Sequence, residues 1–121
     1  MFVKNINECA EFIANDGCLI REWIHPKNDS VDLPYSVAMA TVEIGKQSYK
    51  HKLEQTEVYI VFSGEGVMHI DDEEQDVIPG EAILVPAEAT QWIENSGDEE
   101  LCFIAIVNPP WSDEGDIRVE D

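Results

Sequence analysis

The sequence predicts a single all-β domain, either a sandwich or a barrel, on three observations. Short segments that alternate apolar and polar residues follow one another from Cys18 onward, and a period of two is typical of half-buried strands. Turn-forming Gly, Pro, Asn and Asp residues separate these segments. A length of 121 residues suits one domain that buries its own core.

The expected strands are bounded by turn residues. Pro26 closes the first strand because proline cannot continue a ladder of hydrogen bonds, and Gly64 and Gly80 mark later turns. In chain order the strands are expected at residues 19–24, 36–44, 47–53, 57–62, 67–70, 75–78, 82–86, 92–93 and 101–107. Only residues 6–15 place apolar side chains at helical spacing, which predicts a short N-terminal helix or turn.

The chain divides into three parts within this one domain. Residues 1–16 form an N-terminal extension, residues 17–111 form the barrel, and residues 112–121 form an acidic C-terminal tail. We expect Trp111 to pack back onto the barrel. Chain ends that are rich in charge and interrupted by proline are often poorly ordered, so we expect the last residues to be mobile.

Composition excludes several functions. Seven Lys and Arg residues against 26 Asp and Glu residues give a net charge of -19. This charge repels phosphates and anionic lipids, so we expect neither nucleic-acid nor membrane binding. The three cysteines, Cys9, Cys18 and Cys102, include no close pair, which argues against a disulfide framework or a zinc finger. No signal peptide or membrane-spanning run is visible, and we expect a cytoplasmic protein.

Strand alternation predicts which polar side chains converge. Counting by two from His51 places Tyr49 and Leu53 on the same face, and Glu57 and Tyr59 share a face of the next strand. If both faces point inward, they enclose a mostly apolar pocket with few polar groups, as ligand sites usually do. Histidine and glutamate are both good ligands for divalent ions.

The residues around His51 match a known spacing pattern. The order is Gly45, five residues, His51, any residue, Leu53, three residues, Glu57, six residues and Gly64. This order resembles the first motif of the cupin superfamily, in which a second histidine stands at the position of Leu53. The resemblance to small single-domain cupins implies a double-stranded β-helix, also called a jelly-roll barrel.

A second motif of the same superfamily follows. Gly80, Pro86 and Asn95 stand at the family's spacing, whereas Glu88 replaces a glycine and Gln91 replaces the remaining histidine of the family. The resemblance extends over residues 36–108. Two of the four positions that bind metal in the family have therefore changed their residue type.

The resemblance implies a divalent metal ion held by His51, Glu57 and Gln91. One nitrogen and two oxygens suit Mn, Fe(II), Ni or Zn. Such a metal would act as a Lewis acid on a small organic molecule, in a dioxygenase, isomerase, lyase or decarboxylase. Tyr49 or Tyr59 would supply a proton or orient the substrate. The rival hypothesis is a metal-free barrel that binds or senses a small molecule without catalysis.

Assembly is the last expectation. Exposed sheet edges are usually covered or paired, and small cupins resemble one another in forming dimers. The strand at residues 19–24 offers Trp23 and Ile24 as apolar anchors. We therefore expect a homodimer that pairs along this strand.

Overall fold

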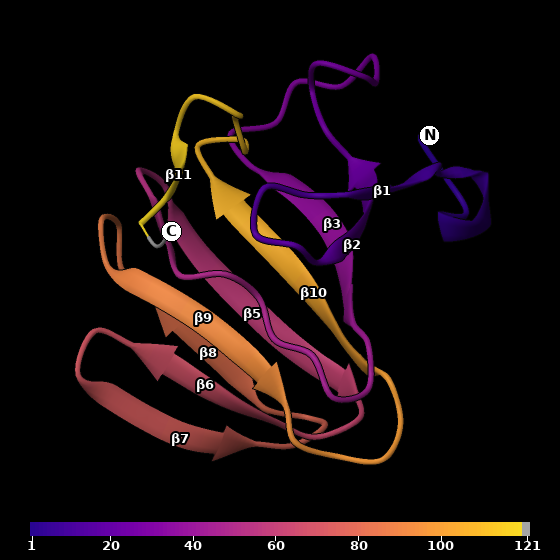
Figure 1. Cartoon of the computed structure of the whole chain (residues 1–121). Helices are drawn as coiled ribbons and strands as arrows, with labels where there is room; N and C mark the ends of the chain where they lie inside the picture. The colour runs from indigo at the N-terminus through magenta and orange to yellow at the C-terminus, as the bar shows by residue number, and fades with distance from the viewer. Residues whose placement is uncertain (120–121) are drawn as a thin grey trace.

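Two antiparallel β-sheets face each other in the computed structural model, which describes residues 1–119 (Figure 1). The first sheet has the order β1 (Glu11–Ile13), β2 (Leu19–Ile24), β3 (Ser36–Val42), β10 (Leu101–Asn108), β5 (Thr56–Ser63) and β8 (Ala82–Val85). The second has the order β11 (Asp116–Arg118), β4 (His51–Leu53), β9 (Thr90–Asn95), β6 (Gly66–Ile70) and β7 (Glu73–Val77). The predicted all-β jelly-roll barrel is confirmed.

The core lies between the two sheets. Along β5, β9 and β10 buried side chains alternate with partly exposed or exposed ones, as the sequence pattern predicts for strands with one face inward. Ile93 and Leu101 are fully buried, and Tyr59 stacks on Phe103 with ring centroids 4.3 Å apart. The described residues contain no helix that is long and apolar enough to cross a membrane.

The N-terminal extension is mostly extended rather than helical. Its helical part is a single 3-10 turn at Ile6–Glu8, and β1 follows at once. The apolar residues at helical spacing do not form a buried helical face, and Ile13 is exposed. Instead β1 pairs with β2, with Glu11 opposite Arg21. Consequently β2 has strands on both sides. The edge strands of this sheet are β1 and β8, and the expectation that β2 forms an edge is wrong.

The predicted acidic tail contains a strand. Asp116–Arg118 form β11, which pairs with β4 so that Asp116 stands opposite Leu53. The expectation of a mobile end is therefore wrong for these residues, because backbone hydrogen bonds to β4 hold them. Residues 120–121 of the predicted tail lie outside the described residues.

Gly64 is expected to be the glycine that least tolerates a side chain. Its φ is +82°, and an added Cβ would collide with the backbone carbonyl oxygen of Glu100. We expect Gly64→Ala to lower the free energy of unfolding by about 2 to 3 kcal/mol, measured by urea denaturation. Gly45, with a φ of +75° and nothing within 4 Å of its added Cβ, is the control, and there the loss should be about 1 kcal/mol. Equal losses would contradict the role of the collision.

Candidate functional site

A cavity of about 60 Å³ lies between the sheets where β4 and β11 face β2, β3 and β10. Its wall is mainly apolar, with Ala38, Leu53, Ala105 and Val107 among the contributing residues. The titratable side chains that reach it are Asp16, Glu22, His25, His51, Glu57 and Asp116. Within the described part of the chain no Lys or Arg lines this cavity. The volume admits a few water-sized groups, or the reacting end of a small molecule.

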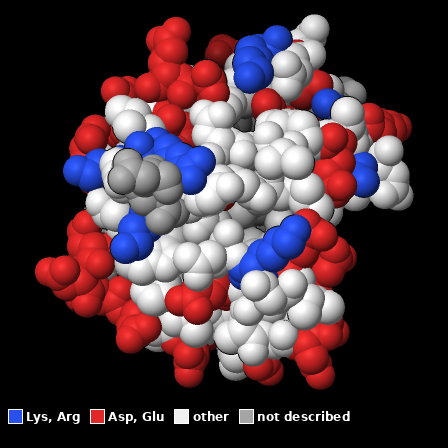
Figure 2. Space-filling view, in the orientation of Figure 1, with Lys and Arg blue, Asp and Glu red and all other residues white. Residues whose placement is uncertain are grey.

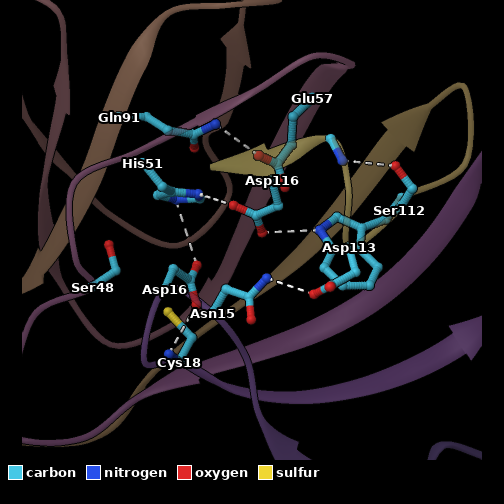
Figure 3. A network of polar contacts seen from close by, with 12 residues as sticks. Asn15, Asp16, Cys18, Ser48, His51, Glu57, Gln91, Ser112, Asp113 and Asp116 are labelled. Atoms are coloured by element: carbon cyan, nitrogen blue, oxygen red, sulfur yellow. Dashed lines mark hydrogen bonds and ion pairs between the residues drawn. The ribbon is translucent and has the colours of Figure 1, made fainter. Parts of the chain in front are cut away.

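His51 at the start of β4 is the centre of the polar groups. Its Nδ1 lies 2.9 Å from Asp116 Oδ1, and the other carboxylate oxygen of Asp116 accepts a hydrogen bond of 3.1 Å from Trp111 Nε1. Figure 3 shows His51 between Asp116 and Asp16. Because a carboxylate can only accept, Nδ1 of His51 carries a hydrogen, and Nε2 is the nitrogen available to a ligand.

The Nε2 atom of His51 is buried and has no hydrogen-bond partner among the described residues. Asp16 Oδ2 lies 3.6 Å from it, which is close enough for an ion pair but too long for a hydrogen bond. Asp16 is itself held in place, because its Oδ1 accepts a hydrogen bond of 2.9 Å from the backbone N–H of Cys18. Buried polar atoms normally have partners, so the unpaired Nε2 marks the position where a ligand atom would bind.

The surrounding carboxylates favour the charged form of His51. Burial lowers the pKa of the imidazole, but the hydrogen bond to Asp116 and the negative charges of Asp16 and Asp116 outweigh burial and raise it above 6.5. A histidine with a raised pKa holds a transferable proton near neutral pH. The site therefore contains a buried proton donor next to an apolar cavity.

A second chain of hydrogen bonds runs through Gln91. The Tyr59 hydroxyl donates to Gln91 Oε1 over 2.6 Å, and Gln91 Nε2 donates to Glu57 Oε1 over 3.1 Å. Burial raises the pKa of Glu57 from 4.5 to about 8, although the charge of His51 and the Gln91 hydrogen bond lower it. Burial also raises the pKa of Tyr59 well above its ordinary value. Tyr59 therefore donates a hydrogen bond to Gln91 and holds its proton more tightly than an ordinary tyrosine.

The raised pKa of Glu57 predicts a pH-dependent stability. The folded protein keeps a proton on Glu57 that the unfolded chain releases, so this stabilisation is present below 4.5 and is lost as the pH rises to about 8. Glu57→Gln is uncharged at every pH. Between these pH values the wild type should lose on the order of 4 kcal/mol more of its free energy of unfolding than Glu57→Gln does.

The measurement is chemical denaturation of both proteins at several pH values. Glu54→Gln, which changes an exposed glutamate next to β4, should keep the pH dependence of the wild type. If Glu57→Gln also kept it, Glu57 would be ionised in the folded state and the assignment would fail.

The residues at the family's metal positions do not fit a metal ion. Leu53 has no donor atom, the oxygen of Gln91 is used by Tyr59, and the nitrogen of Gln91 faces Glu57. Over residues 1–119 no group of three or more His, Cys, Asp or Glu side chains is placed to hold a metal. The three residues predicted to bind a metal do lie near one another, because His51 and Glu57 both line the cavity, and Gln91 donates to Glu57 and stands opposite His51 where β4 pairs with β9.

The remaining predicted site residue, Tyr49, lies elsewhere. It is 41% exposed, its ring is covered by the Arg118 guanidinium at 3.5 Å, and it is not among the residues that line the cavity. Sequence reasoning missed Asp16 and Asp116, the two carboxylates beside His51. No local pattern marks them, because each lies in a turn or a short strand far from His51 in the sequence.

Comparisons with known proteins agree with this fold. Residues 38–107 match the cupin domain family Cupin_2. An uncharacterized protein of Methanocaldococcus jannaschii is 35% identical over 104 residues, which cover 85% of this chain and 82% of that protein.

Two solved structures have the same fold. The predicted oxalate decarboxylase of Thermotoga maritima has a TM-score of 0.78 at 20% identity and covers 89% of this chain and 99% of its own. The Streptomyces nucleoside dehydratase Pac13 has a TM-score of 0.79 at 17% identity, and the match covers 99% of this chain and 92% of Pac13. Because the family match spans more than half of the chain, and the match to the Methanocaldococcus jannaschii protein covers 85% of the chain at 35% identity, this protein belongs to the cupin domain family.

Proposed function

We propose that the cavity binds a small neutral molecule through a hydroxyl group and that His51 transfers a proton to it, without a metal ion. The observation that carries the proposal is the buried, unpaired Nε2 of His51, 3.6 Å from Asp16 Oδ2. A hydroxyl oxygen between these two atoms accepts a hydrogen bond from Nε2 and donates one to the carboxylate. Both polar atoms are then satisfied.

The chemistry of the groups favours an acid–base lyase. The His51 imidazolium donates the Nε2 proton to the hydroxyl oxygen, the C–O bond breaks, and water leaves. The ionised form of Glu57, whose share grows as the pH approaches about 8, takes the proton from the adjacent carbon, and the C–H electron pair becomes the new C=C bond. Return of that proton to His51 restores the starting state. Asp116 is a positioning residue, because its bond to Nδ1 orients the imidazole and stabilises its charge.

The charge of the site favours a neutral ligand over a carboxylate. The cavity has four carboxyl side chains and, among the described residues that line it, no Lys or Arg. Figure 2 shows a largely uncharged centre with Lys and Arg side chains on two sides of it and acidic side chains around the rim of this face. Of the two structural neighbours, a dehydratase acts on a nucleoside and a predicted decarboxylase on oxalate. The anionic wall supports the first kind of substrate.

A second candidate function is binding without turnover. The bonds among Tyr59, Gln91 and Glu57 satisfy these groups internally, which favours a static wall over a base that exchanges protons. The unpaired Nε2 of His51 would then only anchor a ligand. Both candidate functions bind a neutral ligand, but in the second the ligand is released unchanged and no product forms.

The test is a binding and turnover screen with the purified protein. Uridine and small polyols are titrated against wild type and His51→Gln while the His51 ring signals are followed by NMR, and oxalate is the anionic control. We expect a neutral hydroxyl compound to shift the His51 signals in the wild type only, and mass spectrometry to detect loss of water. Binding without product would support the second candidate. Binding of oxalate but of no neutral compound would overturn both.

A further inference from the structure

A second hollow lies where the edge strand of each sheet lines a common groove. Its walls come from β6 and β7 of the second sheet and from β8 of the first. The groove has a volume of about 560 Å³, which is within the range of about 300 to 1,000 Å³ found for ligand pockets. Among the described residues, none lines both this groove and the cavity at His51. The proposed function therefore leaves this groove without a role.

The register of the β6–β7 hairpin (Figure 1) turns two polar side chains of β7 toward the inside of the barrel. Gln75 stands opposite Met68, and Glu73 stands opposite Ile70. Directly opposed residues of an antiparallel pair lie on the same face, and Met68 is buried in the core. Gln75 and Glu73 are nevertheless exposed, because β7 is the last strand of its sheet. The inner face of β7 therefore lines an opening with polar groups instead of closing it with apolar ones.

The floor of the groove is apolar. Its apolar side chains include Met68, Ile70, Val77 and Ile83. Two of these belong to the buried core and the other two pack against it. The groove therefore offers a ligand a fixed hydrocarbon surface beside the polar groups of β7.

The charge of the groove has one sign. Glu73, Glu74 and Glu81 line it, and within the described part of the chain no Lys or Arg does. Glu74 forms an ion pair with His69 at 3.8 Å. Glu81 is held in place, because its Oε1 accepts a hydrogen bond of 2.9 Å from the backbone N–H of Ile78. Glu73 and Glu81 are thus the two carboxylates best placed to attract a cation into the groove.

We propose that this groove binds a protonated organic amine that carries a short hydrocarbon chain. The ammonium group donates hydrogen bonds to the carboxylates of Glu73 and Glu81 and to the amide oxygen of Gln75. The hydrocarbon chain covers the apolar floor and leaves water. The net charge of -19 raises the local concentration of cations and repels anions. Charge and apolar surface together select an alkyl amine over a metal ion or a fatty acid.

The test uses three six-carbon probes that differ only in their head group. Hexylamine, hexanol and hexanoate are titrated into the purified full chain, and the methyl NMR signals of Met68, Ile70 and Ile83 are followed. We expect hexylamine to shift these signals to saturation, hexanol to bind more weakly, and hexanoate to leave them unchanged. Butylamine, which lacks two methylene groups, should bind roughly tenfold more weakly than hexylamine. Hexylamine without a saturable shift, or with larger shifts at His51 than at Met68, would overturn the proposal.

Matched charge variants locate the ammonium group. Glu73→Gln should raise the dissociation constant of hexylamine roughly fivefold, and so should Glu81→Gln, whose amide oxygen can still accept from the Ile78 N–H. Asp76→Asn removes the same charge from the other face of β7, where Asp76 stands opposite Val67 and does not line the groove. This control should leave the affinity nearly unchanged. Equal weakening by Asp76→Asn would show that the amine responds to the overall charge of the chain, and that would overturn the proposal.

Protection of the sheet edge is the competing role of Glu73. Charges that point inward from an edge strand hinder pairing with another chain. Sedimentation of Glu73→Gln distinguishes the two roles, with thermal unfolding as the check that each variant is folded. Self-association of this variant with hexylamine affinity unchanged would assign Glu73 to edge protection and overturn the proposal. If Glu73→Gln does not fold, Glu81→Gln against Asp76→Asn decides.

Discussion

Replacing His51 with alanine is expected to lower the free energy of unfolding at neutral pH by about 3 to 5 kcal/mol, because it removes the positive partner of buried carboxylates. Asp16 is 8% exposed and Asp116 is 9% exposed, so water cannot replace the imidazolium. The pKa of His51 is raised above 6.5. Its stabilisation is therefore complete below 6.5 and is lost as the pH rises through the raised value. Urea denaturation of both proteins as a function of pH measures the difference.

His69 provides a matched control for this prediction. Its Nε2 lies 2.6 Å from Glu94 Oε1 and its ring stacks on Trp92, so it too has a carboxylate partner. Glu94 and Glu74 beside it are exposed to solvent, and exposed ion pairs contribute about 0 to 1 kcal/mol. We expect His69→Ala to lower the free energy of unfolding by no more than about 1 kcal/mol through the loss of this ion pair. Similar losses for the two alanine variants would show that the buried carboxylates do not depend on His51.

Leu53→His together with Gln91→His is expected to create a site for a divalent metal ion. His51 and Leu53 both line the cavity, and Gln91 already contacts Glu57, so the two new imidazoles would join one histidine and one carboxylate. Imidazole nitrogens are strong ligands for Ni and Zn. Isothermal titration with either metal should show binding roughly a hundredfold tighter than in the wild type.

The single variants separate the two contributions. Each should bind metal more weakly than the double variant, and adding His51→Ala to the double variant should remove most of the gain. Gln91→His also breaks the hydrogen bond from Tyr59, so thermal unfolding without metal is measured alongside. No gain in affinity for any first-row metal in a folded double variant would show that these positions do not face one another.

The strands could be predicted because the signal is local. Alternation along Glu57 to Phe62 and along Leu101 to Val107 depends only on which neighbouring side chains face the core. The glycines of the two motifs mark turns for the same reason. The predicted N-terminal helix or turn is present but limited to Ile6–Glu8, because pairing with β2 makes Glu11–Ile13 a strand.

Half of the candidate site could also be predicted. His51 and Glu57 line the cavity as strand alternation and the cupin motif indicate. The role of Gln91 could not be predicted, because it depends on where its amide finds partners, and those are Tyr59 and Glu57. A spacing pattern names a position in the fold but not the hydrogen bonds made there.

The sequence by itself determined the all-β class, the cupin motifs and the inward direction of His51, because each follows from residue type and a spacing of a few residues. Only the tertiary structure decided that Asp16 and Asp116 stand on either side of this histidine. They come from opposite ends of the chain: Asp116 reaches His51 because β11 pairs with β4, and Asp16 reaches it because its carbonyl oxygen accepts a hydrogen bond from the backbone N–H of Tyr49, just before β4. Contacts of that range leave no local pattern, since they arise from how the sheets pack rather than from neighbouring residues.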